Sequence, residues 1–181
     1  KSMESMRKHV ETDGAFCEGF SPKSKLSAWT HLYIAASGGH VPSAFFFATF
    51  TPSLPFEFMA HRDDWELRKQ YGELFLRSAA DAGYAPAVVR AASSYSEKFP
   101  GRGELEDVTP INHYEAAKYA FAARAWKVRE NWTSLSQVIE RSEKAIGAAE
   151  VARARDEARK LVESWNYDPS EYERSNDSLN F

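Results

Sequence analysis

Apolar residues recur at spacings of three and four along much of the chain, and this period predicts amphipathic α-helices. The first clear helix covers residues 26–37, with an apolar face made of Leu26, Trp29, Leu32, Tyr33 and Ala36. A returning helix is expected over residues 42–50, with Ala44, Phe47 and Ala48 as its buried stripe. Asp63 or Asp64 can cap a third helix, which ends at the Ala79-Ala80 pair, and a fourth helix covers residues 86–99.

The second half of the chain predicts two more helices. Thr109-Pro110 has the residue types of an N-cap followed by a first-turn proline, so a helix is expected to begin there. The last helix is expected to begin at Thr133 or Ser134 and to end near Trp165, with Gly147 weakening it by about 1 kcal/mol relative to alanine. The pattern contains no convincing strand and predicts an all-α fold.

Two of these helical hairpins share one sequence pattern, 44 positions apart. Ala35-Ala36, Gly39 and Pro42 recur as Ala79-Ala80, Gly83 and Pro86. A glycine suits the left-handed position that ends a helix, and a proline suits the first turn of the next helix. A hairpin repeated at this spacing favours an α-solenoid of antiparallel helical hairpins.

The pattern favours a single domain over residues 1–181. It divides into a connector or cap over 1–25, two clear repeats over 26–99, a degenerate repeat with a long C-terminal capping helix over 100–165, and a loose tail over 166–181. The charged surface of the last helix fits a cap, because terminal repeats need a polar outer face.

Composition narrows the classes of function. The 181 residues are 43% hydrophobic and 14% aromatic, which supplies a core, and the formal net charge of −3 gives no general reason to expect nucleic acid. No run of 18 apolar residues suggests a membrane span. Cys17 is the only cysteine, so no internal disulfide is expected. Because Lys1 is not an initiator methionine, we expect that an upstream signal segment was removed, and both periplasm and cytoplasm stay open.

The two hairpins resemble Sel1-like repeats, a branch of the tetratricopeptide-like helical repeats. The shared marks are the Ala-Ala pair, then Gly39-His40 or Gly83-Tyr84, then a helix that returns to an aromatic residue, Phe50 or Tyr95. The chain departs from the pattern in an insert over 51–64 and in a large residue at Phe46.

The resemblance implies a right-handed superhelical scaffold that binds other proteins. Some short members in Gram-negative bacteria look like periplasmic immunity proteins, which neutralise secreted toxins such as type VI lipase effectors. The resemblance therefore implies an immunity protein without cofactor, whose partner is a toxin. A structural or adaptor subunit of an envelope or signalling complex is the alternative, and the oligomeric state stays open.

Candidate catalytic groups are sparse. The densest polar segment, residues 61–66, favours helix capping over a metal site because its carboxylates lie at a helix start. His40 occupies the repeated turn, which favours a structural role, and no basic neighbour or nucleophile signature accompanies Cys17. We expect no enzymatic activity, no metal and no cofactor.

The run Phe45-Phe46-Phe47 indicates a binding surface, because three successive helical residues span about 200° and cannot share one buried face. The register places Phe47 inside the hairpin and aligns Phe46 with Arg90 at an outward position. We predict that Phe45, Phe46 and Arg90 bind a partner. The alternative is that the insert, with Phe56 and Phe58, covers them.

The first helices of the hairpins offer a second candidate surface, since they line the concave side of such repeats. Its candidates are His31, Ile34 and Arg77. The acidic residues Glu104, Glu106 and Asp107 are more typical of a solvated loop than of a docking site for a basic partner.

Overall fold

The computed structural model describes residues 28–49, 62–96, 109–126 and 132–165. Within these ranges the fold is all-α, with six helices and no strand. They are α2 (Ala28–Ser37), α3 (Val41–Thr49), α5 (Arg62–Asp81), α6 (Ala85–Ser96), α7 (His113–Ala125) and α8 (Trp132–Ser164). The proposed N-terminal cap, the insert aromatics, Cys17, the acidic loop and the tail lie outside the described residues.

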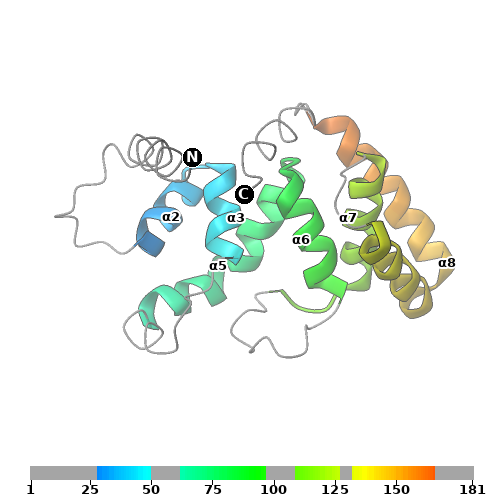
Figure 1. Cartoon of the computed structure of the whole chain (residues 1–181), viewed down its shortest axis with the longest axis horizontal. Coiled ribbons are helices and arrows are strands. Elements are labelled where there is room, and N and C mark those ends of the chain that lie inside the picture. Colours follow the sequence, from blue (N-terminus) through cyan, green and yellow to red (C-terminus); the bar gives the residue numbers. More distant parts are fainter. Residues whose placement is uncertain (1–27, 50–61, 97–108, 127–131, 166–181) are drawn as a thin grey trace, which may run out of the picture.

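The helices lie side by side in the order of the sequence, from α2 at one end to α8 at the other (Figure 1). Each helix makes its most extensive contacts with its neighbours in the chain. Contacts between α2 and α5, and between α6 and α8, join helices that are not consecutive.

The turns α2–α3 and α5–α6 have the same backbone geometry. In the first, Gly39 has a φ of +88°, its N–H donates to the Ala36 carbonyl (2.9 Å), and the His40 N–H donates to the Ala35 carbonyl (3.0 Å). In the second, Gly83 has a φ of +81°, and the bonds from Gly83 to Ala80 and from Tyr84 to Ala79 are both 3.0 Å. This is the Schellman ending of a helix. The two turns therefore match bond for bond at positions 44 apart.

Alanine fills most of the centre of the array. Because its side chain is a single methyl group, alanine lets helix backbones approach closely, and the fully buried alanines include Ala79, Ala80, Ala91, Ala92, Ala116, Ala120 and Ala123. Large aromatic residues fill the α2–α3–α5 end: the Phe47 ring lies 5.7 Å from Trp29 and 5.3 Å from Phe75, both in edge contacts. The predicted buried stripe of α3 is confirmed.

The entry into α7 differs from the prediction. The helix begins at His113, and the Asn112 side chain caps it by accepting bonds from the amides of Tyr114 (3.1 Å) and Glu115 (3.2 Å). The Asn112 N–H donates to the carbonyl of Tyr95 (2.8 Å), which ties this segment to the end of α6. Thr109 is buried before the helix and its hydroxyl caps nothing. The Thr109 cap was therefore wrong, because a tertiary bond fixes where the chain turns.

The long C-terminal helix is also not continuous. Gly147 has φ +79° and ψ +165°, which is not helical, so α8 consists of two segments, 132–146 and 148–164. Arg153 bonds to the Tyr114 hydroxyl at the start of α7 (3.1 Å), and Trp165 contacts Trp126 after its end. Residues 148–164 therefore run parallel to α7. The expected single capping helix was wrong: Gly147 redirects the chain rather than softening it.

Helix α5 begins at Arg62, before both expected caps, so Asp63 and Asp64 lie in its first turn rather than at its N-cap. Six residues on, Arg68 is fully buried, and its Nε and Nη2 donate to the Ala48 carbonyl at 3.0 and 2.9 Å. Its guanidinium also lies 4.8 Å from the centre of the Trp65 ring. Because Ala48 is in the last turn of α3, the cation sits at the negative end of that helix. Arg68 thereby fixes α5 against α3.

Candidate interaction surfaces

The three successive phenylalanines on α3 differ in exposure, as their positions on a helix require. Phe47 is fully buried, whereas Phe46 keeps 49% of its surface exposed and Phe45 is half-buried. Phe45 supports Phe46 in an edge contact at 5.6 Å and packs in turn on Tyr84, the first residue before α6, at 5.5 Å. The exposed ring of Phe46 is thus held on a packed base that spans both hairpins.

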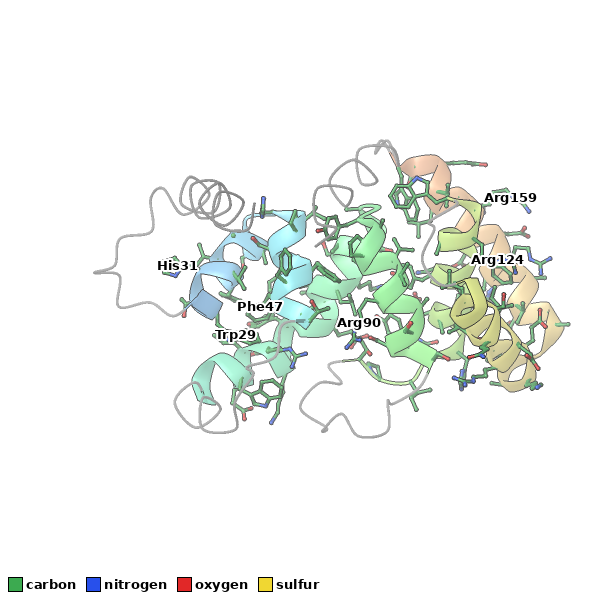
Figure 2. All side chains as sticks on the ribbon, viewed as in Figure 1. Trp29, His31, Phe47, Arg90, Arg124 and Arg159 are labelled. Atoms are coloured by element: carbon green, nitrogen blue, oxygen red, sulfur yellow. The ribbon has the colours of Figure 1, made fainter. Side chains whose placement is uncertain are left out.

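Arg90 has a different environment from the one expected. It lies on α6 in the middle of the array, as Figure 2 shows, and its side chain is half-buried and already interacts within the chain. The register with Phe46 therefore matches helix positions but not exposure. Of the three residues predicted for this surface, Phe46 is the one with a large free area.

The second candidate surface contains a residue that the sequence analysis missed. Ile34 on α2 is 55% exposed, and Leu74 on α5 is 59% exposed. Tyr33, next to Ile34, packs against Tyr71 (5.3 Å) and Phe75 (5.9 Å), so this part of α2 lies against the middle of α5. Leu74 lies opposite the buried residues of its own helix, and this position in the helical period was the available signal.

His31 and Arg77 are less available than Ile34. His31 projects from α2 at the end of the array in Figure 2, but it is half-buried and has an interaction within the chain. Arg77 pairs with Glu115 on α7 at 3.1 Å and lies 4.0 Å from Asp81. About half of the Arg77 side chain is exposed, so it joins two helices at the edge of the surface.

A polar network between α5, α6 and α7 lies beside Arg77. The Tyr119 hydroxyl donates to Asp81 (2.7 Å), the Tyr95 hydroxyl donates to Glu73 (3.1 Å), and the two tyrosine rings stack at 6.1 Å. Burial is the main cause that raises the pKa of both tyrosines above the ordinary range. The carboxylate of Asp81 raises the pKa of Tyr119 further, and the carboxylate of Glu73 raises that of Tyr95. These hydroxyls are therefore fixed donors, and the network serves to join the three helices.

Two cations of this network share the carboxylate of Glu115. Lys118 is buried against Glu115 and also lies 4.5 Å from the centre of the Tyr119 ring. Glu115 thus forms ion pairs with both Lys118 and Arg77. The sequence pattern did not mark Lys118 or Glu115, because both look like ordinary surface residues of a helix.

His40, in the turn between α2 and α3, caps the start of α3. The carbonyl of His40 accepts the Ala44 N–H (3.1 Å), and its Nδ1 accepts the Ser43 N–H (3.3 Å) at the start of α3. The structural role predicted for His40 is confirmed. Within the described ranges no three His, Cys, Asp or Glu side chains gather as metal ligands, and of the 61–66 segment His61 lies outside those ranges. None of the helices described is both long and apolar enough for a membrane span.

Comparison of the chain with protein-family models, with curated proteins and with solved structures finds no match. The candidate surfaces therefore rest on the geometry of this chain.

Proposed function

We propose that this chain is a non-enzymatic, Sel1-like helical-repeat protein that binds another protein. The observation that carries the proposal is the half-exposed Phe46 ring, which packs on Phe45, and Phe45 packs in turn on Tyr84 of the adjoining hairpin. Aromatic side chains in well-packed surroundings are frequent hot spots of protein interfaces. The matched turns at Gly39 and Gly83 support the solenoid of antiparallel hairpins.

The proposed mechanism is steric. The array presents its aromatic surface on helices that pack against their chain neighbours, so the surface loses little conformational freedom when a partner covers it. A partner enzyme whose active site faces this surface loses access to its substrate. We propose a periplasmic immunity protein of this kind, with a secreted toxin such as a type VI lipase effector as the partner. An adaptor subunit of an envelope or signalling complex is the second candidate, and the exposed Ile34 and Leu74 on a separate surface favour it.

The test compares three forms of the protein in affinity capture from its native cell extract: the wild type, Phe46→Glu and Leu74→Glu. Both variants place a carboxylate at a position that is about half exposed, so both should keep their stability within about 0.5 kcal/mol. The expected result is one secreted toxin, held by the wild type and by Leu74→Glu, lost by Phe46→Glu, and inhibited by the purified wild type.

Other outcomes redirect or refute the proposal. Loss of capture only in Leu74→Glu moves the binding surface to α2 and α5. Envelope or signalling proteins in place of a toxin support the adaptor. Capture that neither variant changes refutes both surfaces.

A further inference from the structure

Five aromatic residues lie in two contacting groups on either side of Gly83, in the α5–α6 turn. We call Phe46, Phe45, Tyr84, Trp165 and Trp126 the aromatic strip. Phe46 contacts Phe45, and Phe45 contacts Tyr84. Trp165 lies on Gly83, the residue before Tyr84, so closely that a Cβ on Gly83 would be 2.7 Å from its ring. Trp165 and Trp126 complete the strip, with ring centres 4.8 Å apart.

The two ends of the strip differ in how they are covered. At one end Trp126 is 8% exposed and packs with Ala85, Val89 and Trp165. At the other end Phe46 is 49% exposed. The strip is thus closed where Trp165 packs on Trp126, and open where it reaches α3.

The structure fixes the point at which the following residues begin. The Trp165 Nε1–H donates to the carbonyl of Asp81 at the end of α5 (2.9 Å), and its ring rests on Gly83. The chain therefore leaves the described fold on the strip itself. Beyond Gly83, the Tyr84 ring contacts Phe45, with ring centres 5.5 Å apart, and the Phe45 ring contacts Phe46, with ring centres 5.6 Å apart.

We propose that residues 166–181 of this chain dock on the open end of the aromatic strip and cover Phe46. An extended chain spans about 3.3 Å per residue, so this segment is long enough to pass Tyr84 and Phe45 and reach Phe46. It carries the apolar side chains that such a surface binds, Tyr167, Tyr172, Leu179 and Phe181.

A tethered occupant has an advantage over a separate protein or a second copy of this chain. A short tether gives an effective concentration of about a millimolar, so contacts too weak to hold a free ligand still hold a linked one. Since Trp165 is fixed by a hydrogen bond and by its contact with Gly83, little further closure entropy is needed. The docked segment would compete with the partner for Phe46, so an external partner would bind by displacing it.

The test uses the purified full chain with the photo-reactive residue p-benzoylphenylalanine at position 46. Matched controls carry the same residue at position 34 or 74, which are about as exposed and lie on α2 and α5, outside the strip. After irradiation, the monomer is digested and the crosslinked peptides are identified by mass spectrometry. We expect position 46 to crosslink to residues 166–181 and the controls not to. Replacing both Leu179 and Phe181 with serine should lower that yield about tenfold, as a loss of about 1.4 kcal/mol would.

Four results would overturn the proposal. A crosslinked dimer would identify a second copy as the occupant. A monomer in which position 46 crosslinks to the insert at 51–60 would identify the insert as the occupant, and one with no crosslinked peptide would leave the surface to another protein. An unchanged yield in the double serine variant would show proximity without docking. Because no partner is present, the outcome is independent of whether the capture experiment identifies a toxin.

Discussion

Replacing Gly83 with alanine should destabilise the protein far more than the same change at Gly39. Both glycines end a helix in the same Schellman geometry, with φ values of +81° and +88°. Their surroundings differ: nothing lies within 4 Å of a Cβ placed on Gly39, whereas a Cβ on Gly83 would meet three Trp165 ring atoms at 2.7 to 3.0 Å. The pair therefore separates the cost of the backbone from the cost of the Trp165 contact.

The backbone term is common to both variants and amounts to about 1 kcal/mol for alanine at a positive φ. At Gly83 the Trp165 ring must also move. It would lose its hydrogen bond to the Asp81 carbonyl, worth about 0.5–1.5 kcal/mol, and its contact with Trp126, worth a similar amount. Gly83→Ala should therefore cost about 2–4 kcal/mol, against about 1 kcal/mol for Gly39→Ala.

Urea denaturation followed by circular dichroism measures both free energies of unfolding. A double-mutant cycle adds the decisive control: in a Trp165→Ala background, the cost of Gly83→Ala should fall to the Gly39→Ala value. Equal losses for the two glycine variants in the wild-type background would refute the reasoning, since they would mean that Trp165 does not occupy this position in solution.

Two further predictions concern α8 and the tyrosine network. Gly147→Ala should lower stability by about 1–3 kcal/mol in the same urea assay, because its φ and ψ suit only glycine; a continuous helix would instead gain about 1 kcal/mol. The raised pKa of Tyr119, due to burial and then to Asp81, means that the unfolded chain releases this proton first. Stability should therefore be intact below about pH 10 and fall above it, and Tyr119→Phe should lessen the fall by about 1.4 kcal/mol per pH unit. Equal alkaline slopes in urea titrations would contradict this.

Local chemistry made the hairpins predictable. A glycine that tolerates a positive φ, two residues beyond an Ala-Ala pair, favours the end of a helix through local geometry, and both turns formed where the pattern placed them. The phenylalanine run was predictable for a similar reason. Helical geometry alone forces Phe46 away from the side that buries Phe47.

The failed predictions share one cause. Thr109 has the right residue type for a cap, but the bond from Asn112 to Tyr95 decides where α7 begins. Gly147 is compatible with a weakened helix, but packing of residues 148–164 along α7 favours a break. In both places a contact with a distant helix accompanies the conformation that forms.

The candidate surfaces also combine features that the sequence predicts with features that only packing decides. The sequence by itself determined the all-α fold, the two hairpin turns and the outward position of Phe46, because backbone preference and helical period act within a few residues. Only the tertiary structure decided that Arg90 is half-buried and that Lys118 and Glu115 are buried together. It also placed Trp165 on Gly83, 82 positions away in the sequence (165 − 83). These outcomes depend on which helix covers which side chain, and that choice is settled by packing between segments that are far apart in the sequence.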